Sequence, residues 1–77
     1  MRFHATPHFA RRTEDRLLSS DMVENTVKYG EKHLLRDGTH GGKVFRFVKT
    51  IDGKQFMVFA EIKKSECWLL TAYFNGS

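Results

Sequence analysis

The feature that most constrains this fold is a two-residue turn between two long runs of β-forming residues. Residues 43–51 and 54–62 are rich in β-branched and aromatic side chains, and Asp52-Gly53 separates them. Asp-Gly is favoured in two-residue hairpin turns because both central positions take positive φ angles. The sequence therefore predicts an antiparallel hairpin.

Two further strands are predicted beside this hairpin. Residues 67–74 form a final apolar run after a polar turn at residues 63–66. Residues 32–36 form a brief strand before residues 37–42, a loop with three glycines. Residues 1–7 are short and mixed, so they are either an edge strand or an ordered lead-in.

Two helices are expected before the sheet. The first covers residues 8–18, with Thr6 as its N-cap and Pro7 in its first turn. The second starts at Asp21, which is spaced from Glu24 as a capping box, and ends at Gly30 in a left-handed conformation. Its buried face consists of Met22, Val23, Thr26 and Val27.

The predicted fold class is α+β, with two N-terminal helices packed on a four-stranded antiparallel sheet. Residues 1–77 contain no repeat and no linker, so a single domain is expected.

Strand alternation predicts which side chains share a face of the sheet. Phe45, Phe47 and Ile51 should face the core, which leaves Arg46 on the opposite surface. In the last strand the core set is Trp68, Leu70, Ala72 and Phe74, and the opposite set is Cys67, Leu69, Thr71 and Tyr73. If the strands align accordingly, Arg46 lies on the same surface as Thr71 and Tyr73.

The size, charge and cysteine content of the chain limit the classes of function that it can have. A chain of 77 residues has a small core, so binding to a partner or formation of a homo-oligomer is compatible with its size. Its net charge of +4 favours nucleic acid or an acidic protein as the partner. The single Cys67 cannot form an internal disulfide, which favours a reducing, cytoplasmic location. No apolar run approaches the roughly 20 residues that span a bilayer, so a membrane role is not expected.

The spacing of His8, Arg12 and Arg16 predicts one cationic stripe on the first helix, because residues four apart lie on the same face. Such a stripe can hold a phosphate, and an imidazole beside it can move a proton. The alternative is a solvated face, in which neighbouring Glu14 and Asp15 pair with the arginines.

The run HFARRTEDRLLSSDMV resembles a bacterial and phage family of small domains placed among the RelE-like toxins. The following strands, ending in WLLTAYF, are similar to the wider barnase, EndoU, colicin and RelE nuclease superfamily. This resemblance implies two helices before a four-stranded sheet, metal-independent cleavage of RNA, and antitoxin proteins as partners.

The resemblance also implies site residues. Metal-free RNA cleavage needs a base, an acid and positive charge around the phosphorus. His8 would be the base or acid, Arg12 and Arg46 would hold the phosphate oxygens, and Thr71 and Tyr73 would orient the phosphate.

Further nucleic-acid contacts are predicted at four positions: Arg11, Arg16, His40 and Lys43. Around His40, glycines would let backbone amides approach an anion, although a Gly-rich loop is more often only a turn. No metal and no cofactor is expected, because His4 and His33 have no ligands at suitable spacing.

The predicted function is a metal-independent ribonuclease or toxin-like RNA-acting domain, with RNA and an antitoxin or other acidic protein as partners. Two alternatives stay open. One is a non-catalytic module that binds RNA or protein, and the other is a homo-oligomeric structural domain.

Overall fold

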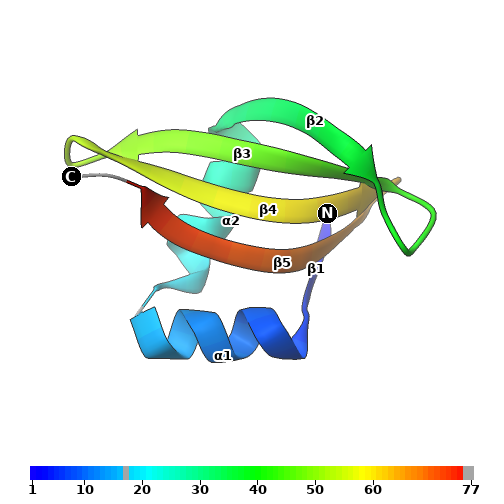
Figure 1. Ribbon diagram of the computed structural model, residues 1–77, viewed down its shortest axis with the longest axis horizontal. Coiled ribbons are helices and arrows are strands. Elements are labelled where there is room, and N and C mark those ends of the chain that lie inside the picture. The colour runs from blue at the N-terminus through cyan, green and yellow to red at the C-terminus, as the bar shows by residue number, and fades with distance from the viewer. Residues whose placement is uncertain (17, 76–77) are drawn as a thin grey trace.

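A computed structural model describes residues 1–16 and 18–75, without the side chains of Arg12, Glu14, Asp15 and Arg16. Within these residues the chain forms two helices and a five-stranded sheet with strand order β1-β5-β4-β3-β2. The helices are α1 (Pro7–Arg16) and α2 (Ser20–Tyr29), and the strands are β1 (Arg2–Ala5), β2 (Glu31–Asp37), β3 (Lys43–Ile51), β4 (Lys54–Lys63) and β5 (Glu66–Asn75). Figure 1 shows α1 running alongside β5 and α2 crossing behind the sheet.

The predicted hairpin is confirmed. β3 and β4 pair in antiparallel register from Lys43 opposite Ile62 to Ile51 opposite Lys54. Asp52 has a φ of 51° and Gly53 a φ of 77°, the two positive angles that a tight hairpin turn requires.

The predicted α+β class holds, but the sheet has five strands and is mixed rather than four-stranded and antiparallel. β1 pairs in parallel with β5, with Arg2 opposite Glu66 and Ala5 opposite Leu69. The backbone N–H of Arg2 also donates to the carbonyl of Ser65 at 2.7 Å. Four residues are too few to show a strand period, so the sequence left this segment open between an edge strand and a lead-in.

Helix capping follows the prediction at α1 and departs from it at α2. The Thr6 hydroxyl accepts a hydrogen bond from the backbone N–H of Phe9 at 3.2 Å, as expected of an N-cap. At α2 the N-cap is Ser19 rather than Asp21, because the Ser19 hydroxyl accepts from the N–H of Met22 at 3.1 Å. Gly30 is extended, with a φ of −73°, and not left-handed.

The two sheet faces have different environments, and we call them the inner and outer faces. The inner face carries Phe47, Phe56 and Val58, which form the core cluster together with Phe9 of α1 and with α2. A hydrogen bond between Lys49 and Asn25 also ties α2 to this face. The outer face carries the alternate side chains of each strand and has neither helix packed on it.

A bulge in β5 changes the predicted distribution of side chains. Phe59 pairs with Thr71 but Ala60 pairs with Leu69, so Leu70 is the extra residue. Before the bulge Trp68 is on the outer face, opposite Glu61, and after it Ala72 is on the inner face, opposite Val58. The prediction of Trp68 as a core residue is therefore wrong, because a strict two-residue alternation cannot pass through a bulge.

Cys67 lies on the inner face in the core cluster and is fully buried. Burial raises the pKa of its thiol to about 12. No helix within the described residues is long and apolar enough to cross a membrane.

The Ser19 cap provides a test of the fold. Replacing Ser19 with Ala removes the acceptor for the Met22 N–H, so we expect the free energy of unfolding to fall by about 1 kcal/mol in urea titrations followed by circular dichroism. Ser20→Ala is the matched control, because Ser20 is exposed in the first turn of the same helix, and its effect should stay within about 0.5 kcal/mol. Equal losses in the two variants would contradict the assignment of the cap.

Candidate functional site

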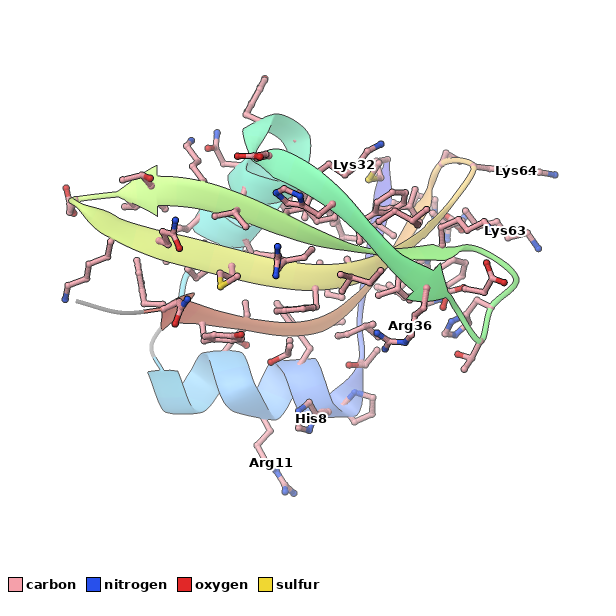
Figure 2. All side chains as sticks on the ribbon, turned by 45° about the horizontal axis from the view of Figure 1, so that its top comes forward. His8, Arg11, Lys32, Arg36, Lys63 and Lys64 are labelled. Carbon is pink, nitrogen blue, oxygen red and sulfur yellow. The ribbon has the colours of Figure 1, made fainter. Side chains whose placement is uncertain are left out.

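A cluster of ionisable and aromatic side chains lies at one end of the outer face. It forms where the loop between β2 and β3 and the turn between β4 and β5 come together. Figure 2 shows Lys63, Lys64 and Arg36 gathered at this end of the sheet, around the loop and the turn. These two connections position the side chains described below.

Glu61 of β4 holds the β2–β3 loop against the sheet. Its Oε2 accepts hydrogen bonds from the backbone N–H groups of His40 and Gly42, both at 2.8 Å. Its Oε1 lies 3.0 Å from Nδ1 of His40. Only 1% of Glu61 is exposed, because the loop covers it. A charged residue on the open face is thereby almost fully removed from solvent.

The loop can approach this closely because residue 38 is a glycine. A Cβ atom at Gly38 would lie 2.0 Å from Cδ of Glu61, a separation that atoms do not tolerate. The glycines that predicted a simple turn thus have a second role, which is to bring the backbone onto a carboxylate.

The pKa of Glu61 reflects two opposing effects. Burial raises it, whereas the hydrogen bond from the His40 side chain, followed by those from the backbone of Gly42 and His40, lowers it. The net result is a pKa below the ordinary value of 4.5, so Glu61 is ionised at neutral pH.

The imidazole of His40 is held by Glu61 and Trp68, and the Thr39 hydroxyl oxygen also lies 3.4 Å from its Nδ1. Besides the Glu61 carboxylate, it stacks on Trp68 with ring centroids 4.2 Å apart and planes at 9°. An ionised carboxylate only accepts hydrogen bonds, so Nδ1 of His40 must carry the proton of this contact. Nε2 is then the nitrogen available to a ligand, and 40% of the His40 side chain is exposed.

A second imidazole stacks on the same indole. His4 is opposite Trp68 on β1, on the other side from β4, and its ring centroid is 5.5 Å from that of Trp68. Nε2 of His4 lies 3.3 Å from Oε1 of Glu66, and Nη1 of Arg2 lies 3.6 Å from the same oxygen. Trp68 therefore separates two histidines, each of which is paired with its own carboxylate.

These groups border a pocket of about 480 Å³ on the surface. It is lined mainly by Arg2, His40, Lys63, Lys64, Glu66 and Trp68. Three of these side chains are cations, and the other polar side chains are an imidazole and a carboxylate, two groups that serve as general acids or bases. Such a pocket suits an anion whose chemistry needs proton transfer, and a phosphate ester has both properties.

The residues predicted on the sheet lie near one another, one row further along the outer face. Arg46 and Thr71 are both opposite Phe59, and Tyr73 is opposite Met57 on the same face. The predicted sharing of one surface by Arg46, Thr71 and Tyr73 is therefore confirmed. Their assignment to catalysis stays a prediction.

The helix residues do not join them in the way that was expected. Figure 2 shows His8 and Arg11 projecting from α1 away from the sheet, and both are exposed. α1 turns Phe9, rather than His8, toward the core, so among the described side chains His8 does not lie with Arg46, Thr71 and Tyr73. The side chains of Arg12 and Arg16 lie outside the described part of the structure.

Of the two predicted loop residues, only His40 is in the pocket. Lys43 is exposed and pairs with Asp37 at the ends of β2 and β3. Sequence reasoning missed Glu61, Glu66 and Trp68. A lone acidic residue inside the apolar run VFAEI was the available signal, since a carboxylate at such a position needs a buried partner.

No group of three or more metal-ligating side chains occurs within the described residues.

Residues 5–74 match the family described as Domain of unknown function (DUF4258), and the chain belongs to this family. The matched residues include His40, Glu61, Glu66 and Trp68, and exclude Arg2 and His4. No curated protein and no solved structure matches the chain.

Replacing Glu61 with Gln tests the link between the loop and the sheet. At pH 7 the variant should lose about 1–3 kcal/mol of unfolding free energy, because a neutral amide accepts these hydrogen bonds less well. The pKa of Glu61 is lowered in the folded state, so its contribution is present above the unfolded pKa and is lost as the pH falls through the folded one. The difference between the two proteins should therefore shrink below about pH 4.5 in urea titrations.

Glu31→Gln is the matched control, because Glu31 also pairs with a histidine, at 3.1 Å from His33, but is 74% exposed. Its effect should stay within about 0.5 kcal/mol at every pH. A pH-independent loss in Glu61→Gln would contradict the role given to the ionised carboxylate.

Proposed function

We propose that this member of the DUF4258 family is a metal-independent endoribonuclease whose reacting phosphodiester binds in the pocket beside His40. One observation carries the proposal. The imidazole of His40 is held by a buried carboxylate and a tryptophan, with its second nitrogen free, at the edge of a cation-lined pocket. A histidine fixed in this way is suited to moving a proton to or from a bound ester.

The chemistry needs no group from outside the chain. In RNA the 2′-hydroxyl attacks the adjacent phosphorus, so the 2′-oxygen to phosphorus bond forms as the bond from phosphorus to the 5′-oxygen breaks. The products are a 2′,3′-cyclic phosphate and a free 5′-hydroxyl. One protein group accepts the proton of the 2′-hydroxyl, and another protonates the leaving 5′-oxygen.

Two groups in the pocket fit these roles. Glu66 lies beside Arg2 and His4, and its carboxylate accepts the proton of the 2′-hydroxyl. His40 gives a proton from Nε2 to the 5′-oxygen, while the hydrogen bond between Nδ1 and Glu61 holds the orientation of the ring. Lys63 and Lys64 neutralise the negative charge that grows on the phosphate oxygens.

This assignment moves the reactive histidine from the first helix to the β2–β3 loop. It keeps the substrate class that the RelE-like resemblance implies, and it gives Arg46, Thr71 and Tyr73 a place next to the pocket instead of inside it. An acidic antitoxin-like protein is a compatible partner for the cationic rim.

The decisive variant is His40→Asn, because an asparagine amide can still donate to Glu61 but cannot transfer a proton. We expect cleavage of total tRNA or ribosome-bound mRNA, in the presence of a chelator, to fall by about 100-fold or more, with unfolding free energy nearly unchanged. The readout is the rate of appearance of fragments with cyclic phosphate ends.

His33→Asn and His8→Asn are the matched controls. His33 lies on the outer face and also pairs with a carboxylate, whereas His8 is on the exposed side of α1. Both should retain cleavage within about twofold of the parent. Loss of cleavage in His8→Asn alone would favour the helix site. RNA binding without cleavage in every protein would identify a non-catalytic binding module.

The cationic rim gives a separate test. The double variant Lys63→Ala/Lys64→Ala should bind a non-cleavable 2′-O-methyl RNA more weakly, and the slope of log K against log salt should decrease by about 0.7 for each phosphate that the variant no longer neutralises. Lys28→Ala/Lys54→Ala removes the same charge from α2 and from the start of β4 and should leave the slope unchanged. Equal slopes for the two double variants would show that Lys63 and Lys64 do not contact the phosphates of the bound RNA.

A further inference from the structure

The pocket beside His40 has cations that suit a phosphate but offers no platform for a base. Trp68 is the aromatic side chain of the pocket, and imidazoles of His4 and His40 stack on it from the β1 side and the β4 side. A nucleobase therefore cannot stack on this indole without displacing a histidine. If the pocket holds one phosphate of an RNA strand, the neighbouring bases must contact another part of the surface.

The next rows of the outer face carry two aromatic rings. Phe59 of β4 and Tyr73 of β5 lie with ring centroids 6.0 Å apart and planes at 13°. Both side chains are half-buried, so part of each ring reaches solvent. Nearly parallel aromatic rings on an open sheet are a surface on which unpaired bases stack.

Arg46 adds charge and hydrogen-bond donors to these rings. It lies directly opposite Phe59, and His33 lies opposite Arg46 on the next strand. The Nε atom of Arg46 is buried and has no hydrogen-bond acceptor among the residues that the structure describes, so any contact with a ligand is made by the outer part of the guanidinium. A guanidinium in this position can contact a phosphate or stack against a base.

The aromatic rings lie on the same face as Trp68, which lines the pocket. Trp68 is opposite Glu61, Phe59 is two residues from Glu61 along β4, and a strand advances about 6.6 Å over two residues. Tyr73 is opposite Met57, a further two residues along the same strand. A single extended strand of nucleic acid can thus pass from the pocket over both rings without leaving the outer face.

The composition of this face favours nucleic acid over an apolar protein partner. Two of its aliphatic side chains are already packed, since Met57 is 7% and Val44 2% exposed, and Val48 is half-buried. Among the exposed large apolar side chains in the described part of the chain, Met1 and Tyr29 lie outside the strands, and Leu34 and Phe74 are opposite the inner-face residues Phe45 and Phe56. Leu35 is the extra residue of the bulge in β2. What this face offers to a ligand is aromatic and cationic, which is the combination that binds single-stranded nucleic acid.

We propose that the outer face around Phe59, Tyr73 and Arg46 is a base-stacking subsite that selects single-stranded RNA and positions its neighbouring phosphodiester in the His40 pocket. A duplex does not fit this role, because its bases are stacked on one another and closed to aromatic side chains. The inference deepens the proposed function and rests on it for the identity of the ligand, but its test does not depend on cleavage.

The experiment measures binding of a fluorescein-labelled, 2′-O-methyl single-stranded RNA of ten nucleotides by anisotropy, with the full chain. Phe59→Leu and Tyr73→Leu keep an apolar side chain at each position and remove the ring. Each should weaken binding about tenfold with an unchanged salt slope, because the base no longer stacks while the cationic side chains still hold the phosphates. Tyr73→Phe keeps the aromatic ring and should bind the RNA with the parental affinity. Tyr29→Leu, which removes an aromatic ring that is 75% exposed on α2, is the matched control and should bind like the parent.

Several results would overturn this subsite. Unchanged affinity in both leucine variants would do so, as would parental binding of a duplex of the same sequence. The third such result would come from light scattering, if the parent protein is a dimer and both leucine variants are monomers. A second copy of the chain, rather than RNA, would then cover this face. Loss of cleavage in His40→Asn together with ring-dependent binding would support both proposals. Ring-dependent binding without any cleavage by the parent protein would support the subsite and would contradict the proposed ribonuclease activity.

Discussion

The carboxylate of Glu61 is the interaction on which the organisation of the outer face depends. It is taken out of solvent by the β2–β3 loop and accepts hydrogen bonds from two backbone N–H groups and one imidazole of that loop. A buried carboxylate without these donors would be strongly unfavourable, so the loop and the ionised side chain require each other. Because the same contact orients His40, a single structural constraint fixes both the conformation of the loop and the direction in which its histidine faces.

The bulge at Leu70 determines which aromatic residues are available on that face. Upstream of it, the shift in register puts Trp68 on the outer side, where it separates His4 from His40. Downstream of it, Thr71 and Tyr73 lie on the same side, so β5 contributes outward-facing residues on both sides of the irregularity. An unbroken strand would place Trp68 and Tyr73 on opposite faces. Bulges often redirect side chains near functional sites, and this one combines two aromatic environments on a single surface.

Much of the architecture could be predicted from the sequence, because it depends on local signals. The Asp52-Gly53 turn, the Thr6 cap and the order of the helices and antiparallel strands follow from residue type and spacing. β1 could not be predicted as a parallel strand, since its pairing with β5 joins residues that are distant in the sequence. The site was predicted less well for the same reason. Arg46, Thr71 and Tyr73 share a face as their alternation indicates, whereas the pairing of His40 with Glu61 depends on a loop closure that no local pattern encodes.

The burial of Cys67 has a practical meaning for the whole sheet. With its pKa near 12, the thiol is almost entirely uncharged at neutral pH, and only the thiolate attacks disulfides or alkylating reagents. The Cys67 side chain also lies on the inner face within the core cluster, so a reagent reaches it only after that core opens. The rate at which the single thiol is modified in native buffer thus reports how often the core beside β5 opens.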